Sequence, residues 1–534
     1  MLYFILQIVC AFAHRNILVF MVDDMGYNDL HSFPTPTINK LSSNGILLQN
    51  HYTAITCTPS RASFLTGKYP VNTGLTSALL YNNPYGLHNH TTFPQILQEN
   101  NYKTSLIGKW HLGYAHEDYL PNNNGFDNFY GILNGASDHY TNKVKNIYDL
   151  YNNTNPVFNN NYSTELYTDI TLNHLIEPFF TMVSYQALHT PLQVPKKYLK
   201  KCNIKNRFRK QYCGMMVAID KSMKKIINKL KKDNSWKNTL ILFLTDNGGQ
   251  PFYGASNYPY RGSKNSVFEG GTKGIAFLNG GLIKKSFKYT GLIHISDWFP
   301  TLLSFLDIKY NSDNLDGINL LNNIFENKKS DRKEMLIHYD TYSKSFCYRK
   351  GHWKIIVGNT GDSSLFGIYD SKICSLNELP IDKLVCFFNY ILADKYFFLN
   401  EIIREFRNVV KKNSIGGNVI INRQIDNILL YNLEIDPYEL NDVSKKYPNK
   451  TNELLKKINI NINNIQYPWF VADSNVKYKT FNNKLYHHPW IDSNHKVEEY
   501  NFVKYFVMKI VIINIFIMLS FCFIYKKINV FLHK

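Results

Sequence analysis

The fold class is decided by the stretch Asn16 to Val22 (NILVFMV), which is followed at once by Asp23-Asp24. Six of its seven residues are apolar, so it lacks the alternation of a strand with one face in water. Thr239 to Thr245 (TLILFLT) repeats the pattern and stops at Asp246-Asn247. Such runs are typical of strands buried on both faces of a largely parallel sheet. The sequence therefore predicts an α/β fold with a large, mostly parallel sheet.

The polar residues that follow these two strands predict a metal site. In open α/β sheets, ligands bind outside the carboxyl ends of the strands, so Asp23, Asp24, Asp246 and Asn247 are expected to meet in one crevice. Carboxylate and amide oxygens are hard ligands, which favour Ca²⁺ or Mg²⁺ over zinc. One acidic pair alone would be explained as well by a helix cap or a turn. Two pairs placed alike favour the metal site.

Two further strands are expected to bring basic residues to the same edge of the sheet. Residues Tyr102 to Gly108 lead into Lys109-Trp110-His111, and Phe179 to Tyr185 lead to His189 after three more residues. A single histidine after a strand is more often a packed or surface residue than a catalyst. Two in equivalent positions fit general acids and groups that bind phosphate or sulfate.

Cys57 lies after the first strand in the run HYTAITCTPSRASFLTG, from His51 to Gly67. Thr58 is expected to cap a short helix that has Pro59 at its first position and ends at Gly67. Cys57 would then precede a helix N-terminus, where free N–H groups and the helix dipole favour an anion. Taken alone, a buried thiol or half of a disulfide is the commoner explanation for such a cysteine.

Length and composition indicate a globular chain of two domains. The chain has 534 residues, 44% of them hydrophobic and 15% aromatic, which excludes a disordered protein. Its net charge of +19 would suit an anionic substrate or a membrane surface. A codon bias that enriches Lys, Asn, Ile, Tyr and Phe explains the charge equally well. No aromatic–basic module supports nucleic-acid binding.

Both ends of the chain resemble targeting segments. Residues 1–13 contain an apolar stretch that ends in Ala11-Phe12-Ala13, as a cleaved signal peptide does. An apolar run over residues 502–525 predicts a transmembrane helix, with a basic cytosolic tail at 526–534. A buried C-terminal helix is the alternative. We therefore expect a secretory-pathway, single-pass type I membrane protein with a luminal or extracellular catalytic part, in the lysosome, the ER or the cell surface.

A secretory route permits disulfides and glycans. Apart from Cys10, Cys57 and Cys522, an odd number of cysteines remains, so at least one is unpaired: Cys202, Cys213, Cys347, Cys374 and Cys386. None shows metal-ligand spacing. Glycosylation sequons occur at Asn89, Asn152, Asn161 and Asn449. The Asn-rich stretch from Asn142 to Asn161 is expected to form a surface loop.

The run CTPSRASFLTGKYP, at residues 57–70, resembles the signature of type I sulfatases, C-x-P-S-R followed by L-T-G. Other stretches resemble the blocks of that family in family order: VDDMGYNDL, GKWHLG, ALHTPLQVP, FLTDNGG, RGSKNSVFEGG and LYNLEIDPYELNDVS. The resemblance covers most of residues 16 to 445. GKWHLG, LPNNNGFDNFYG and HTPLQVP are most similar to the arylsulfatase B group, which includes N-acetylgalactosamine-4-sulfatase.

The resemblance implies a fold and a set of roles. The fold is an alkaline-phosphatase-like sandwich over residues 14–335 and a smaller C-terminal α+β domain with an antiparallel sheet over 336–500. The implied ligands of one Ca²⁺ are Asp23, Asp24, Asp246, Asn247 and residue 57. The formylglycine-generating enzyme would convert Cys57 to formylglycine (3-oxoalanine), whose hydrate is the nucleophile. The other implied catalytic residues are Arg61, which holds the formylglycine; Lys109 and His111, beside the aldehyde; and His189 and Lys264, which with Lys109 bind the sulfate.

The resemblance implies hydrolysis of sulfate esters: aryl sulfates in vitro, and sulfated sugars or glycosaminoglycans in vivo. Two alternatives stay open. One is a phosphodiesterase or phosphonate hydrolase of the same superfamily; the other is a membrane-anchored glycan-binding protein that has lost catalysis, against which the complete motif set argues. Residues 374–427 resemble no family block, and soluble lysosomal members lack a C-terminal span. The natural substrate and the compartment therefore stay open.

Overall fold

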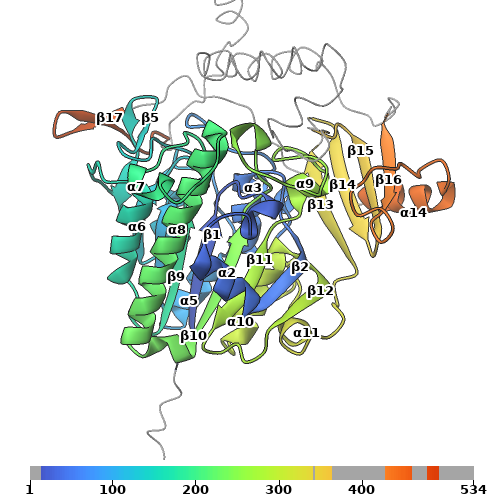
Figure 1. The fold of residues 1–534 in the computed structure, drawn as a ribbon, viewed down its shortest axis with the longest axis horizontal. Coiled ribbons are helices and arrows are strands. Elements are labelled where there is room, and N and C mark those ends of the chain that lie inside the picture. Colours follow the sequence, from blue (N-terminus) through green and yellow to red (C-terminus); the bar gives the residue numbers. More distant parts are fainter. Residues whose placement is uncertain (1–13, 341–342, 362, 364–426, 460–477, 492–534) are drawn as a thin grey trace, which may run out of the picture. The chain divides into compact units, whose positions relative to one another are not determined.

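The computed structural model describes residues 14–340, 343–361, 363, 427–459 and 478–491. Its main element is a ten-stranded sheet of order β12-β2-β11-β10-β1-β9-β3-β4-β7-β8 (Figure 1). Five neighbouring strands at its centre run parallel: β10 (Thr239–Thr245), β1 (Asn16–Val22), β9 (Phe179–Tyr185), β3 (Lys103–Lys109) and β4 (Asn128–Ile132). All residues of β1, β9 and β10 are buried. The predicted α/β fold with a mostly parallel sheet is confirmed.

The outer strands make the sheet mixed. At one edge, β12 (Phe287–His294) runs parallel to β2 (Ile46–Tyr52), and β11 (Ala276–Gly280) lies antiparallel between β2 and β10. At the other edge, β7 (Leu150–Asn152) and β8 (Asn155–Pro156) continue the sheet in antiparallel pairs.

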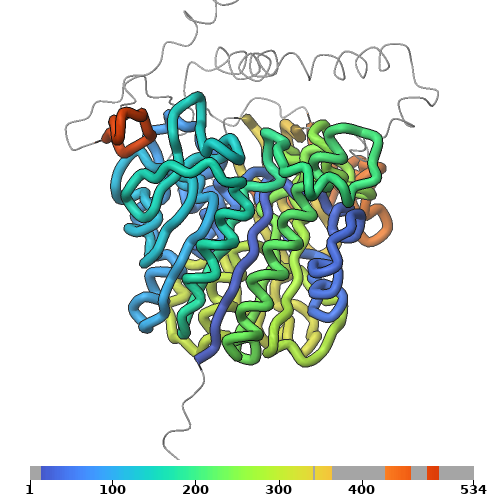
Figure 2. The backbone as a smooth tube through the Cα atoms, turned by 60° about the vertical axis from the view of Figure 1, so that its left-hand side comes forward, coloured from blue at the N-terminus to red at the C-terminus, as the bar shows by residue number. Residues whose placement is uncertain are grey.

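Helices cover both faces of the sheet, as the alternation along β1 shows. Ile17, Val19 and Met21 share one apolar cluster with residues of three helices: α3 (Cys57–Thr66), α5 (Phe93–Glu99) and α10 (Trp298–Phe305). The intervening residues of β1 share the other cluster with α2 (Pro36–Ser43) and the long helix α8 (Arg207–Lys232). Helix α6 (Ser163–Leu172) packs beside α8 (Figures 1 and 2). Neighbouring side chains of a strand point to opposite faces of the sheet. Each face therefore has its own apolar core, covered by its own helices.

Helix α14 (Pro448–Asn459) has 12 residues. The remaining helical segments of the described chain have five residues or fewer: α4 (Pro70–Thr73), α7 (Lys196–Leu199), α9 (Glu269–Thr272), α11 (Leu321–Phe325), η1 (Tyr27–Leu30), η2 (Glu117–Tyr119), η3 (Pro121–Asn124), η4 (Ser235–Asn238), η5 (Pro251–Tyr253) and η6 (Ile295–Asp297).

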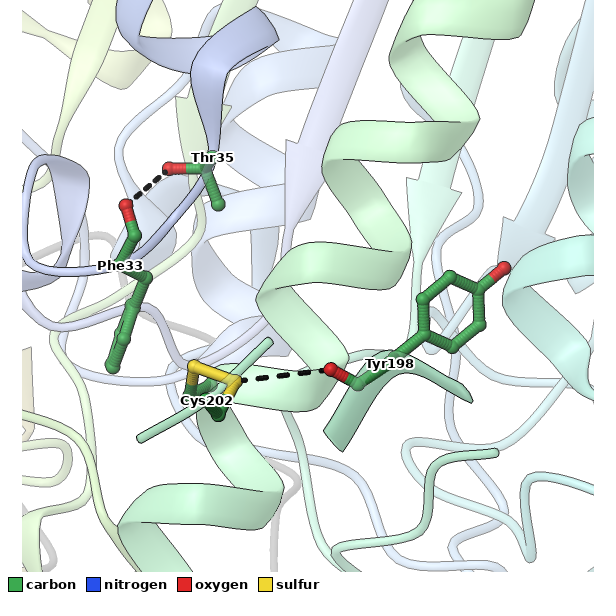
Figure 3. Close-up of a disulfide and its surroundings, with 5 residues drawn as sticks. Phe33, Thr35, Tyr198 and Cys202 are labelled. Atoms are coloured by element: carbon green, nitrogen blue, oxygen red, sulfur yellow. Dashed lines mark hydrogen bonds between the residues drawn. A yellow bond between two sulfur atoms is a disulfide. The ribbon is translucent and has the colours of Figure 1, made fainter. Parts of the chain in front are cut away.

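One disulfide, between Cys202 and Cys213, joins the segment after α7 to helix α8 (Figure 3). The Cys202 sulfur also lies 4.0 Å from the carbonyl oxygen of Tyr198. Cys57 and Cys347 are free and buried. The sequence left this pairing open; Cys374 and Cys386 lie outside the described residues.

A smaller antiparallel sheet follows the large one. Its four strands are β13 (Glu334–Asp340), β14 (Ser345–Lys350), β15 (Trp353–Gly358) and β16 (Ile428–Asn432), in that order. It confirms the expected antiparallel sheet near the C-terminus. The domain boundaries at 335 and 500 stay predictions.

A buried ionic cluster joins the two sheets. The ammonium group of Lys354, on β15, lies 2.9 Å from Glu269 Oε1 and 2.8 Å from Glu439 Oε1. The hydroxyl of Tyr52, on β2, donates a hydrogen bond of 2.5 Å to the other Glu269 oxygen. Burial alone would lower the pKa of Lys354, but the two carboxylates raise it above its ordinary value. The lysine is therefore charged and holds two carboxylates that would otherwise repel each other.

We expect Lys354→Met to lower the free energy of unfolding by about 3–5 kcal/mol, because buried Glu439 loses its counter-ion and Glu269 keeps only the more distant Lys273, at 3.8 Å. Urea denaturation measures the effect. Lys350→Met is the matched control, since the Lys350–Glu453 pair is about 40% exposed on both sides and is worth at most about 1 kcal/mol. An equal loss of unfolding free energy in the two variants would contradict the role of Lys354 in neutralising the buried cluster.

The expectation of a surface loop over Asn142 to Asn161 was wrong. This stretch contains β5 (Lys143–Val144), β6 (Ile147–Tyr148), β7 and β8, and the Asn142 side chain is buried and donates to the Asn159 carbonyl at 2.9 Å. A hairpin of β17 (Tyr478–Phe481) and β18 (Lys484–His487) pairs with β6 and completes a third sheet, β17-β18-β6-β5. Strands of two residues are too short to show a periodic pattern in the sequence.

The predictions for the chain ends fall on residues that the structure does not describe, namely 1–13, 502–525 and 526–534. Among the residues that it does describe, no helix is both long and apolar enough to cross a membrane. The four sequon asparagines are exposed, as a glycan requires.

Candidate active site

The ends of β1 and β10 bring the predicted acidic residues together. The two strands are paired in register up to Val22 and Thr245, so the residues that follow lie side by side. The Asp24 amide nitrogen is 3.3 Å from Asp246 Oδ1. One oxygen each of Asp23, Asp24 and Asp246 and the sulfur of Cys57 lie within 4.8 Å of one another, and all four residues are buried.

This cluster fits a hard divalent cation. Among the described residues, two of its buried oxygens have no hydrogen-bond partner: Asp24 Oδ2 and Asn247 Oδ1. A buried polar atom without a partner costs free energy, which a bound cation would remove. Carboxylate and amide oxygens are the ligands that Ca²⁺ and Mg²⁺ prefer. The residues that could hold such an ion are Asp23, Asp24, Asp246 and Asn247, beside position 57.

Two buried lysines balance the acidic cluster. Lys109 Nζ lies 2.6 Å from Asp23 Oδ2, and Lys264 Nζ lies 2.6 Å from Asp24 Oδ1. Burial alone would raise the pKa of both aspartates, but Lys109 at Asp23 and Lys264 at Asp24 lower both values below the ordinary one. Both groups are therefore carboxylates at neutral pH. The site combines fixed negative charge for a cation with fixed positive charge for an anion.

Arg61 connects helix α3 to three strand ends. Its Nε and Nη2 atoms donate to Asp246 Oδ2 at 3.1 and 2.8 Å. Its Nη1 atom donates to Ser184 Oγ at 2.6 Å and to the Lys109 carbonyl at 3.2 Å. Ser184 was missed in the sequence, although it is the penultimate residue of the predicted strand Phe179–Tyr185. Because Arg61 lies one helical turn after Cys57, these bonds also fix the position of Cys57.

Helix α3 begins two residues earlier than expected. Cys57 is its first residue and extended Thr56 is its N-cap, so the prediction that Thr58 caps the helix was wrong. The physical reason is that the Thr58 hydroxyl bonds elsewhere: it donates to the His111 carbonyl at 2.9 Å and accepts from the Leu79 amide at 3.2 Å. The end of the helix at Gly67, in the left-handed conformation, is as predicted.

The Cys57 sulfur lies 3.3 Å from Asp23 Oδ1. Burial raises the pKa of this thiol far above its ordinary value, and Asp23 and Asp246 raise it further. A protonated thiol is a poor nucleophile, because the thiolate is the reactive form. An unmodified cysteine at this position is therefore unsuited to attack an anionic ester.

His111 is held as a neutral imidazole with one free nitrogen. Its Nε2 atom lies 2.9 Å from the Leu79 carbonyl, which can only accept, so Nε2 carries the hydrogen. Nδ1 is buried and has no hydrogen-bond partner among the described residues. Burial lowers the pKa of His111 well below its ordinary value, and Lys109 lowers it further. His111 can thus accept a proton at Nδ1.

His189 reaches the cluster from the segment after β9. Its Nε2 atom is 3.8 Å from Asp24 Oδ2, and its side chain is 20% exposed, more than that of Asp24 or Lys264. Behind it, His139 Nε2 donates to the His189 carbonyl at 3.2 Å, and Gln186 Nε2 donates to His139 Nδ1 at 3.1 Å. His139 and Gln186 carry no signal in the sequence that would have pointed to this supporting role.

Gly108 shows why the residue before Lys109 is a glycine. Its φ is +117°, and a Cβ atom there would lie 1.9 Å from the Ser184 carbonyl oxygen. Asp24 and His111 also have positive φ, 56° and 60°. Non-glycine residues in this region store strain, which is found most often at functional sites.

Comparison with known proteins identifies the family. The family model described as Sulfatase matches residues 15–308. Mouse arylsulfatase J is 32% identical over 479 residues, which cover 84% of this chain and 75% of the relative. Mouse N-acetylgalactosamine-6-sulfatase is 30% identical over 357 residues, which cover 59% and 67%.

A solved structure supports the fold. The crystal structure of Ps i-CgsB in complex with k-i-k-neocarrahexaose has a TM-score of 0.69 and 24% sequence identity, and the match covers 86% of this chain and 95% of that one. The family match spans the strands β1, β3, β9 and β10 that position the acidic cluster, Cys57 and both lysines. The chain therefore belongs to the sulfatase family of sulfuric ester hydrolases.

Proposed function

We propose that the chain hydrolyses sulfate esters of sugars, with formylglycine at position 57 and one Ca²⁺ as cofactor. The Ca²⁺ would be held by Asp23, Asp24, Asp246, Asn247 and residue 57. The observation that carries the proposal is the buried cluster in which three carboxylates, two of them paired with lysines, surround the Cys57 sulfur. The disulfide at Cys202 supports maturation in the secretory pathway, where the formylglycine-generating enzyme would meet the chain.

The residues around position 57 suit attack on an anionic ester. When bound, the ion would polarise a sulfate oxygen, and formylglycine hydrate would supply the nucleophilic hydroxyl. Lys109 and Lys264 would offset the negative charge of the sulfate, which otherwise repels a nucleophile. His189, at the more open side, would donate a proton to the leaving alcohol, and His111 Nδ1 would accept one. Arg61 would hold residue 57 in place.

We also propose that the chain is most similar to the arylsulfatase B group and that it is a single-pass type I membrane protein. Its catalytic part would lie in the lysosome, in the ER lumen or at the cell surface. Sugar esters are proposed as substrates because Ps i-CgsB, of the same fold, was solved with a carrahexaose. The net charge of +19 agrees with a polyanionic partner.

Comparing turnover of an aryl sulfate with that of an aryl phosphodiester tests the proposed reaction. We expect the sulfate to have the higher kcat/KM by at least about 100-fold; both esters carry one negative charge, but the phosphodiester brings a second ester group to the buried cluster. His189→Ala serves as the control, because contaminating enzymes would not respond to it. A preference for the phosphodiester would favour the phosphodiesterase alternative and overturn the proposal.

A further inference from the structure

The third sheet carries lysines that lie on aromatic rings. Lys143 Nζ is 4.5 Å from the centre of the Tyr148 ring. Lys484 Nζ is 5.2 Å from the same ring and 4.6 Å from the ring of Phe158. The Tyr148 and Phe158 rings pack edge to face, 4.7 Å apart. Two strand pairs that are distant in the sequence thus build one patch of ammonium groups and ring faces.

A second group of the same kind connects this patch to the catalytic cluster. Lys145 Nζ lies 4.5 Å from the centre of the Tyr81 ring and 3.4 Å from its hydroxyl. Tyr81 lies two residues after Leu79, and the Leu79 carbonyl accepts the hydrogen bond of His111. Two residues of chain span at most about 7 Å. The Tyr81 backbone therefore lies within about 7 Å of the residue whose carbonyl holds His111. Together Tyr81, Lys143, Lys145, Tyr148, Phe158 and Lys484 are called the basic–aromatic surface.

The hairpin β17–β18 is fixed to this place by a buried histidine. His487 Nδ1 lies 2.9 Å from the Tyr114 hydroxyl, and His487 Nε2 lies 3.4 Å from the Val144 carbonyl. Tyr486 of β18 pairs with Tyr148 of β6. In Figures 1 and 2 the hairpin lies on the side of the large sheet toward which strand β1 runs. The position of Lys484 is thus set by hydrogen bonds rather than by a loose loop.

Little negative charge lies in the strands of this surface, although Asp138 is close: its amide nitrogen donates to the Lys143 carbonyl at 3.0 Å, and its carboxylate accepts hydrogen bonds from Thr141 and Gln193. Among the described residues, no carboxylate forms an ion pair with Lys143, Lys145 or Lys484. The only acidic residue between positions 143 and 158 is Asp149, and residues 478–487 contain none. Asp149 is buried, accepts hydrogen bonds from Asn134, and has a pKa that burial raises to about 7. The surface is therefore positive and suited to an anion.

We infer that the basic–aromatic surface binds the sulfated sugars next to the one that is cleaved, so that the substrate is a polymeric sulfated glycan. This inference rests on the proposed function. Ammonium groups pair with sulfate, and ring faces pack on the apolar faces of sugar rings. We expect an aryl sulfate to fill only the catalytic cluster, because it has no further sugar units to place on this surface. The surface therefore selects for chain length, while the cluster performs the reaction.

The test compares two triple variants of the full chain with the same loss of charge. One is Lys143→Ala/Lys145→Ala/Lys484→Ala; the control is Lys224→Ala/Lys232→Ala/Lys288→Ala, all exposed and outside the third sheet. The readouts are turnover of 4-nitrocatechol sulfate, its inhibition by chondroitin sulfate and by heparin, and direct binding of fluorescent heparin. We expect the first triple to weaken polymer binding and inhibition about 3- to 30-fold, with a weaker dependence on NaCl. Turnover of the aryl sulfate should not change.

The inference would be overturned by the following results. Equal losses in both triples, or no inhibition and no binding by sulfated polymers in the wild type, overturn the inference. Loss of binding to phosphatidylserine vesicles with unchanged heparin binding identifies a membrane contact and also overturns it. A wild type without aryl sulfatase activity counts against the proposed function instead, while heparin binding still tests the surface. Lys→Gln at the same three positions replaces the alanine triple if its thermal unfolding shows a misfolded protein.

Discussion

Cys57→Ala is expected to reduce turnover of aryl sulfates by about 10⁴-fold or more, as loss of a covalent nucleophile does in other hydrolases. The effect should fall on kcat, because the lysines that bind the sulfate remain. Alanine removes only one sulfur atom at the first position of α3, where Arg61 holds the helix. The change is measured with 4-nitrocatechol sulfate on protein whose circular dichroism matches that of the wild type.

Cys347→Ala is the matched control for this variant. Both cysteines are free and fully buried, and the Cys347 thiol lies in the apolar cluster of the smaller sheet, where it donates to the Val267 carbonyl oxygen at 3.8 Å. The control should keep its activity, although a small cavity lowers its stability by about 1–2 kcal/mol. Residual turnover of several per cent in Cys57→Ala would contradict the role of position 57.

Removal of calcium is expected to have the second large effect, on both stability and activity. A ligand that binds only the folded state stabilises it by about 2.7 kcal/mol at 100 times its dissociation constant. Thermal unfolding in EGTA should therefore occur at a lower temperature than in excess Ca²⁺, and sulfatase turnover should stop. The three carboxylates keep Lys109, Lys264 and Arg61 as partners, but Asp24 Oδ2 and Asn247 Oδ1 would be left buried without the cation.

Asn247→Ala tests the same site without leaving an unpaired charge. Its Oδ1 atom has no hydrogen-bond partner among the described residues, and its Nδ2 atom donates to Asp24 Oδ1 at 2.8 Å. The variant should need a higher Ca²⁺ concentration to reach the same unfolding temperature. Asn319→Ala, at an exposed position, should behave like the wild type. If both variants reached half of the calcium-dependent rise in unfolding temperature at the same Ca²⁺ concentration, the ion would lie elsewhere.

The strands that position the site could be predicted because their signal is local. The bounds of β1, β9 and β10 agree with the predicted ranges, and β3 differs by one residue. An uninterrupted apolar run is typical of a central parallel strand, and the polar residue that follows marks its carboxyl end. Asp23 and Asp246 could therefore be placed at one edge without any knowledge of the helices.

Features that depend on distant partners could not be predicted. The start of α3 depends on the contact of Thr58 with His111, 53 residues later in the chain. The ion pair of Lys354 and Glu269 joins residues 85 positions apart, and strand β6 needs its partner β18 from the other end of the chain. None of these residues belongs to a periodic pattern. Tertiary contacts, rather than local preference, decide their structure.

The central claim is that residue 57 acts as an aldehyde made from cysteine, and one measurement tests it directly. The full chain is produced in a eukaryotic secretory pathway, and the tryptic peptide Leu41–Arg61, which contains Cys57, is examined by mass spectrometry. We predict the mass of formylglycine or its hydrate at position 57, in a fraction that rises with the specific activity of the preparation. An unmodified thiol throughout, in a preparation that turns over sulfate esters, would contradict the account.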